Sequence, residues 1–463
     1  MKHIKYTRFD SRFSQIMIAS SITLFIALLW IKLPHPALAA IAFLPMMAVV
    51  ALQIPFILCL AFISFSFFRI HEVFPQLYPL HIPQLLALGT LGSLAVNLTL
   101  KRIEVFWTRE MAVFTFFLGL VIIGALLATN RAAALGSLNG TYIKIAAMVF
   151  AIGWLLREEK QFKGVIFTMV FSGIAVGIVA LINKSSGIGL VEGTRVTIGR
   201  DIGSMLGDPN DLSLVLLFPA SFAVSMILTP GFGKPYRILG AIGFITVVAA
   251  VIATQSRGGL LGICAVSGIY AWHRFENKVL LITLGVAALG VLFVLAGVSD
   301  RASGGAHEEG IDESAMGRIY AWQAAMGMAL HHPIIGVGIN NFISNYFEYS
   351  PHWDGQNHAV HSTWFGVLAE TGMLGLGIFI TIITLIARIS IRSMHQCSPE
   401  NKTHTYVPAV YACAQSLQAG LAGFCVSGTF LTMGFTWPVY ILLSIAIALS
   451  HFKNPPLTDR IAN

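Results

Sequence analysis

The residues best suited to chemistry are arginines and histidines that interrupt an otherwise apolar sequence. A polar interval at about 298–360 contains Arg318 and leads through His358 to His361. A guanidinium fork matches phosphate oxygens bidentately, and a histidine can accept a proton near neutral pH. These residue types are typical of a site that stabilises an anionic leaving group while a hydroxyl is deprotonated.

Arg257 lies in a second polar segment, Gln255-Ser256-Arg257-Gly258-Gly259, between two apolar stretches. An arginine within a membrane costs about 2.5–3.5 kcal/mol at the helix centre, so it is usually paired or functional. Snorkelling to lipid headgroups is the alternative. The two glycines leave room for a ligand or another backbone to approach.

A third segment carries Arg195 and Arg200 ahead of a polar turn at 203–211. Asp208 or Asn210 is expected to cap the helix that follows. Because a helix start favours an anion, Arg200 is a further candidate phosphate ligand and Arg195 a secondary one.

Each of these residues also has a plainer explanation. Arg318 can form a surface ion pair with Glu313, and His361 can simply be hydrated at a helix start. His358 and His361 have a spacing that metal ligands adopt. The loop has no cysteine and no HExxH pattern, so we expect no metal and no cofactor. A general base at His361 is favoured, with His358 as the second candidate.

Lys144 and Glu370 are the remaining charges inside apolar segments. Glu370 either faces a cavity or holds a loop group by a hydrogen bond, and the sequence leaves both open.

The elements that position these residues are membrane helices. Of 463 residues, 56% are hydrophobic and 11% charged, and the mean hydropathy is +0.77, whereas soluble domains carry roughly 25% charged residues. We therefore predict an all-α polytopic membrane protein. The basic segment 1–12 and the apolar segment 14–31 are interpreted as a retained first helix. Five cysteines without paired spacing indicate neither disulfides nor zinc.

Apolar runs and charge predict about 12 to 14 crossings. The net charge of +8 gathers in alternate gaps between spans, the positive-inside pattern, so we expect both termini in the cytoplasm and no nucleic-acid partner. This topology places the segments 184–210, 254–259 and 298–360 on the opposite, extracytoplasmic face. The expected spans are 14–32, 36–52, 55–69, 82–100, 111–129, 139–156, 164–183, 211–229, 237–254, 258–272, 279–297, 361–387, 406–430 and 432–451.

The chain divides into four expected parts, with the long loop as the third. Within the loop, 299–310 is predicted to be flexible, and 313–330 to form an amphipathic helix at the membrane surface that Pro333 ends. The four parts are an N-terminal bundle 1–183, central helices 184–297 with the arginine segments, the loop 298–360, and C-terminal helices 361–463.

Taken together, these segments resemble the O-antigen ligase and polymerase superfamily of bacterial inner-membrane glycosyltransferases. The resemblance covers about 195–391, and its order and spacing are more specific than any one piece. The pieces are Arg200-Asp201-Ile202-Gly203 with Asp208-Pro209-Asn210-Asp211-Leu212; Gln255-Ser256-Arg257-Gly258-Gly259; Gly317-Arg318 with Trp322 and His332-Pro333-Ile334-Ile335-Gly336-Val337-Gly338-Ile339-Asn340-Asn341-Phe342; and His361-Ser362 with Ala369-Glu370-Thr371-Gly372-Met373-Leu374-Gly375.

The resemblance implies a GT-C-like fold with a large periplasmic loop between two late helices. It also implies transfer of an undecaprenyl-diphosphate-linked O-antigen-type glycan to a hydroxyl of lipid A core at the periplasmic face of the inner membrane. By motif match, His361 would be the general base of a metal-independent, inverting reaction, and Arg257, Arg318 and Arg200 would bind the diphosphate. The family often has His-Asn where this chain has His361-Ser362.

Other functions stay open at this point. The same pattern fits a polysaccharide polymerase or a protein O-oligosaccharyltransferase, which differ only in the acceptor. A polyprenyl-lipid or solute transporter also has many spans and buried charges, although transporters usually show two related halves and this chain does not.

Overall fold

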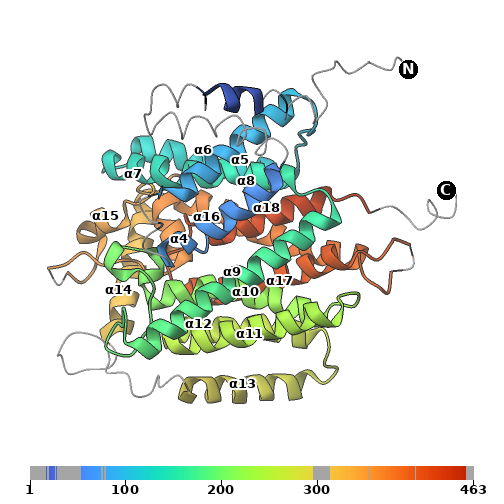
Figure 1. Cartoon of the computed structure of the whole chain (residues 1–463). Helices are drawn as coiled ribbons and strands as arrows, with labels where there is room; N and C mark the ends of the chain where they lie inside the picture. The colour runs from blue at the N-terminus through green and yellow to red at the C-terminus, as the bar shows by residue number, and fades with distance from the viewer. Residues whose placement is uncertain are drawn as a thin grey trace. The chain divides into compact units, whose positions relative to one another are not determined.

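A computed structural model gives the chain a helical fold (Figure 1). No β-strand occurs among the residues that it describes, apart from one isolated bridge between Val191 and Arg195. The predicted all-α membrane fold is confirmed. The expected span 36–52, most of 14–32 and the segment 299–310 lie outside the described residues. Those described are 17, 20–26, 28, 54–73, 77, 80–295, 313–353, 355–401 and 403–454.

Within the described part, eight helical segments are long and apolar enough to cross a membrane. Each expected span from residue 55 onward corresponds to a helix, while the total number of crossings stays a prediction. The eight are α5 (Ile82–Thr99), α6 (Arg109–Leu127), the run α7 (Arg131–Ser137), η3 (Leu138–Tyr142) and α8 (Ile143–Leu155), α9 (Glu159–Ser186), α10 (Pro209–Leu228), α11 (Lys234–Thr254), α16 (Thr363–Gln396), and α17 (Pro408–Ser427) with η7 (Gly428–Phe430).

The described residues form further helices as well. They are α3 (Pro55–Ser66), α4 (Ile70–Val73), α12 (Arg257–Trp272), α13 (Lys278–Leu295), α14 (Glu313–His331), α15 (Phe342–Tyr349) and α18 (Trp437–His451), with the 3-10 turns η4 (Arg200–Ile202) and η5 (Met205–Gly207).

The chain forms two compact units. One contains Met1–Phe62 and Pro83–Val105, and in it Gly89 of α5 lies against Leu58 of α3. The other contains Ile63–Ile82 and Phe106–Asn463, and so includes every candidate site residue.

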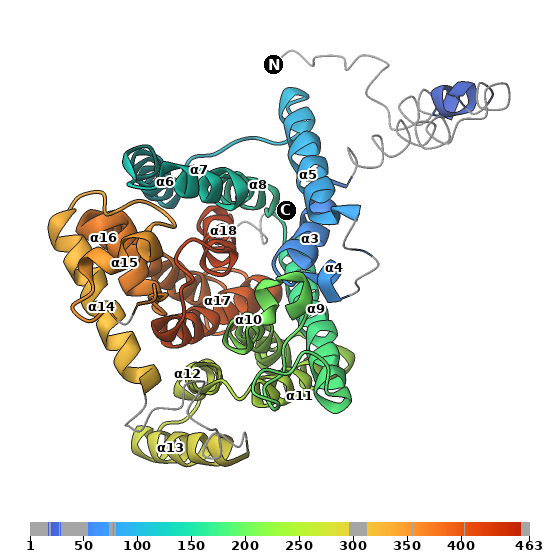
Figure 2. The ribbon, with the colours of Figure 1, turned by 90° about the vertical axis from the view of Figure 1, so that its left-hand side faces the viewer.

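Helix α10 forms the centre of the second unit and is buried along most of its length, with α9, α11, α12 and α17 packed around it (Figure 2). Close packing uses small residues, as is common between membrane helices. Gly259 and Gly262 of α12 lie against Ser213 and Leu217 of α10. The predicted glycine pair therefore admits a neighbouring helix at Gly259.

The helix predicted at 313–330 is confirmed as α14, which ends before Pro333. It packs on α16 through a face of small residues, and Ala321, Ala324 and Ala325 are fully buried there. The larger apolar side chains of the helix, Met316, Ile319, Met326 and Leu330, are exposed. Alanines permit the close approach, because their side chains leave little between the two helices.

A kink at Gly372 interrupts α16, where φ is 70° and ψ is −174°. The connection between α14 and α15 fills this break with backbone hydrogen bonds. The Val337 amide donates to the Ala369 carbonyl at 2.9 Å, and the Met373 amide donates to the Pro333 carbonyl at 2.7 Å. The segments 332–342 and 369–375, which the sequence analysis quoted separately, are thus joined by main-chain hydrogen bonds.

The far side of the same connection is held by Asn341. Its Oδ1 accepts the Asn130 amide at 2.8 Å and the Thr129 hydroxyl at 3.1 Å, at the turn between α6 and α7. The connection is therefore fixed between α16 and α6, which gives the start of α16 a rigid support.

Candidate functional site

Three central helices begin at the same end of the second unit. Asp208 caps α10 by accepting the Asn210 and Asp211 amides at 2.7 and 3.3 Å, as predicted. Ser256 caps α12 by accepting the Gly259 amide at 3.2 Å, and Ser362 caps α16. Helix N-termini carry a partial positive charge, so their convergence favours an anion.

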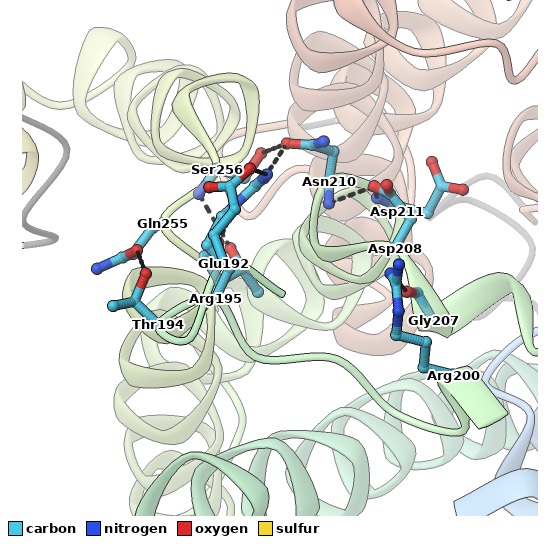
Figure 3. Close-up of polar contacts among 11 residues, drawn as sticks. Glu192, Thr194, Arg195, Arg200, Gly207, Asp208, Asn210, Asp211, Gln255 and Ser256 are labelled. Carbon is cyan, nitrogen blue, oxygen red and sulfur yellow. Dashed lines mark hydrogen bonds and ion pairs between the residues drawn. The ribbon is translucent and has the colours of Figure 1, made fainter. Parts of the chain in front are cut away.

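Asn210 connects the first two of these helices (Figure 3). Its Oδ1 accepts the Ser256 hydroxyl at 2.9 Å and an Arg195 guanidinium nitrogen at 2.8 Å. Arg195 is buried, also donates to the Thr254 carbonyl at 3.3 Å, and lies 3.8 Å from Glu192. This arginine therefore joins the segment 191–198 to α10 and α11 from inside the protein.

Arg200 lies on a compact loop that leads into α10. Its Nη1 donates to the Gly207 carbonyl at 3.1 Å, and the side chain is exposed beside Asp208 (Figure 3). The loop is held from behind by Glu72 of α4, a buried carboxylate that accepts hydrogen bonds from Ser204 and Arg69. The exposed guanidinium is thus carried by a well-anchored loop.

Arg257 is the first residue of α12 and its side chain is exposed. The chain reaches it through Gln255, whose left-handed backbone (φ 52°) ends α11 and turns directly into α12. Gly258 lies near Ser427 and Phe430 at the end of α17. Arg257 therefore projects from a helix start that adjoins the α17 end.

The start of α16 is fixed to that same α17 end. Thr363 donates its hydroxyl to the Leu431 carbonyl at 2.7 Å and accepts the Met433 amide at 3.1 Å. The Trp364 indole donates to the Thr429 hydroxyl at 3.1 Å. The end of α17 therefore contacts both the start of α12, which carries Arg257, and the start of α16, which follows His361.

His361 has a left-handed backbone, with φ 44°. Such a conformation is uncommon outside glycine and often marks a functional position. The preceding Val360 carbonyl accepts the Trp322 indole at 3.1 Å, and Trp322 stacks on Phe365 with centroids 5.1 Å apart. Since Arg318 precedes Trp322 by one helical turn, α14 presents its arginine beside His361.

The electrostatics of His361 connect four of the predicted residues. Its side chain keeps access to solvent, but desolvation by the surrounding protein lowers its pKa, and the charges of Arg318 and His358 lower it further. Asp208 acts in the opposite direction. His361 is therefore held neutral to lower pH than an ordinary histidine, which suits a proton acceptor.

This balance predicts opposite shifts for two variants. Arg318→Gln removes a positive charge and is expected to raise the pKa of His361. Asp208→Asn keeps a capping side chain but removes a negative charge, and is expected to lower it further. The measurement is a ¹H–¹³C NMR titration of labelled histidine, with the His361→Asn variant assigning the resonance. If neither variant changes the titration midpoint of that resonance, the charges of Arg318 and Asp208 do not act on His361.

Glu370 lies about two helical turns into α16 and is buried. Its carboxylate accepts the Phe342 amide at 3.3 Å, and its carbonyl accepts the Gly338 amide at 3.1 Å. Of the two roles left open by the sequence, the structure supports holding the loop. Lys144 is exposed on α8.

Several site contacts were not predicted from the sequence. Asn210 was expected only as a possible cap, and Glu72 was not singled out although it follows Arg69 and His71 at the end of an apolar run. That run of charged residues was the available signal. Within the described residues, no group of three or more His, Cys, Asp or Glu side chains is arranged to hold a metal ion.

The fold and this end of the helices define a polytopic helical membrane protein with basic and histidine side chains gathered at three helix starts. Residues 242–380, which carry Arg257, Arg318 and His361, match the family model described as O-antigen ligase, and this match supports the resemblance to the O-antigen ligase superfamily. The match supports a membrane glycosyltransferase-type function. Comparison with curated proteins gave no significant match.

Proposed function

We propose that the protein transfers a glycan from an undecaprenyl-diphosphate donor to an acceptor hydroxyl on lipid A core, at the periplasmic face of the inner membrane. The observation that carries this proposal is the environment of His361. Desolvation and the charge of Arg318 lower the pKa of its imidazole, and the charge of Asp208, which caps α10, acts on it as well. The family match supports the glycan and lipid classes.

In the proposed step, the acceptor oxygen attacks the anomeric carbon as its proton passes to the imidazole of His361. The bond from the anomeric carbon to the diphosphate oxygen breaks, and the electron pair leaves with the polyprenyl diphosphate. The acceptor oxygen attacks from the face opposite the leaving oxygen, so this single displacement inverts the configuration. Arg257, Arg318 and Arg200 offset the charge on the leaving group.

A metal is not required by this scheme, because fixed guanidinium groups stabilise the diphosphate without a Lewis acid. The test is transfer in proteoliposomes from a purified polyprenyl-diphosphate glycan, with EDTA present. Transfer that depends wholly on added divalent metal would contradict the arginine mechanism. Parallel acceptors, namely lipid A core, a second lipid-linked repeat and a serine peptide, separate the ligase from a polymerase or a protein glycosylase.

The arginines are expected to act through their fork geometry as well as their charge. Arg257→Lys keeps the charge but loses the bidentate pairing, and we expect kcat/KM for the donor to fall about 10- to 100-fold, the loss of one charge-assisted contact. The measurement is initial rate against donor concentration. Arg237→Lys on α11, exposed in a basic cluster away from these helix starts, is the control. If kcat/KM for the donor is unchanged in Arg257→Lys, the guanidinium fork of Arg257 does not bind the diphosphate.

A further inference from the structure

Aromatic rings gather on α14, on α15 and on the segment that leads from α15 to the proposed base. We call the side chains of Tyr320, Phe347, His352 and Trp353 the aromatic platform. Tyr320 stacks on His352 with centroids 4.7 Å apart, and Trp353 meets Phe347 edge-on at 4.9 Å. Phe347 is 63% exposed and Trp353 41% exposed. Contiguous exposed apolar patches rimmed by polar residues mark binding sites.

The platform is anchored to the folded core. Trp353 rests against the buried ring of Tyr346 at 6.4 Å, and Tyr346 belongs to the apolar cluster that α14 and α15 form with α16 (Figure 2). Ser350 fixes the backbone of His352 with two hydrogen bonds, at 2.7 and 3.3 Å. The rings are therefore arranged before any ligand arrives, which lowers the entropic cost of binding.

The platform leads toward His361. His358 packs edge-on against Tyr346 with centroids 5.4 Å apart, and the charge of His358 acts on His361. A ligand that covers Trp353 and reaches past His358 would therefore place its end at the proposed base.

The composition of this segment favours a sugar over a membrane surface. Residues 342–362 contain no Lys or Arg, which interfacial helices use to contact anionic lipid headgroups. The same segment contains Glu348, Ser350, Gln356 and Asn357, which offer carboxylate, hydroxyl and amide groups. The C–H groups on one face of a pyranose pack against the electron-rich face of an aromatic ring, while its hydroxyls bind such polar groups.

We propose that the aromatic platform binds the sugar rings of the acceptor and so places its hydroxyl at His361. This inference rests on the proposed function, since it takes His361 to receive the proton of that hydroxyl. The platform acts in binding and takes no part in the bond changes. Its removal should therefore raise the acceptor KM and leave kcat and the donor KM unchanged.

The transfer test compares Trp353→Ala, Trp353→Phe and Phe347→Ala with the wild type, using lipid A core as the varied acceptor. We expect Trp353→Ala to raise the acceptor KM roughly 3- to 10-fold, the loss of one aromatic contact, and Trp353→Phe to restore most of it. Trp272→Ala is the matched control, since Trp272 is 49% exposed at the other end of α12. If the wild type transfers glycan and the acceptor KM is unchanged in Trp353→Ala and Phe347→Ala, the platform proposal is wrong while the proposed function stands. A wild type that transfers nothing overturns the proposed function.

A binding test needs no turnover. We expect the released core oligosaccharide to change the tryptophan emission of the wild type and of Trp272→Phe, but not that of Trp353→Phe. The competing occupant is tested in vesicles of phosphatidylethanolamine and phosphatidylglycerol with brominated acyl chains. Quenching of the Trp353 contribution by those chains would show a membrane anchor and overturn the proposal.

Discussion

Replacing His361 by Asn is expected to lower kcat for glycan transfer by about 10²- to 10⁴-fold, the usual contribution of a positioned general base. Asparagine tolerates the left-handed backbone at this position (φ 44°), so the variant removes the base while keeping the local conformation. His361→Ala should lose as much activity. The measurement is single-turnover transfer from the polyprenyl-diphosphate donor, with membrane expression confirmed for each variant.

The pH profile gives a second test of the same residue. Because the pKa of His361 is lowered from its ordinary value of 6.5, the neutral base persists below that pH. We therefore expect the acidic limb of kcat/KM to fall with a midpoint below 6.5, and activity to be kept at higher pH until another group titrates. His358→Gln is the control and should retain most activity. Full activity in His361→Asn together with its loss in His358→Gln would transfer the role to His358.

The helices and their shared face were accessible from the sequence because both depend on local composition. Long apolar runs predict spans, and clusters of basic residues predict their orientation, which is enough to predict one shared side for Arg200, Arg257, Arg318 and His361. The caps of α10 and α12 were similarly local, since Asp208 and Ser256 act within three residues.

Side-chain partners were not accessible, because they depend on which helices meet. Nothing local distinguishes Arg195, which is buried on Asn210, from Arg200, whose guanidinium is exposed. The same holds for Glu370, whose partner Phe342 lies 28 residues earlier and reaches it only after α14 has packed on α16. The sequence indicated two chemical roles, binding of a diphosphate and acceptance of a proton, whereas tertiary contacts decide which residues are placed to fill them.

The lock between the α14–α15 connection and the kink of α16 is a structural feature with a large expected effect. Gly336 has φ 64°, and a Cβ there would lie 2.4 Å from the Ala369 carbonyl oxygen and from the Thr371 amide nitrogen. Gly372 lies in a region that essentially only glycine adopts, and a Cβ there would lie 2.6 Å from the Pro333 carbonyl oxygen. Both contacts are with main-chain atoms, which cannot rotate away.

Gly336→Ala and Gly372→Ala are therefore each expected to destabilise the protein by more than about 3 kcal/mol, since backbone strain of roughly 1–3 kcal/mol adds to the steric conflict. The measurement is the midpoint of thermal unfolding in detergent, followed by tryptophan emission. Gly377→Ala is the control on the same helix, because a Cβ there meets nothing within 4 Å. It should be neutral or slightly stabilising, as alanine favours a helix by up to about 1 kcal/mol over glycine. Equal midpoints for Gly336→Ala, Gly372→Ala and Gly377→Ala would mean that the connection yields to an added methyl group, and that the start of α16 and His361 are held mainly by the Thr363 contacts with the α17 end.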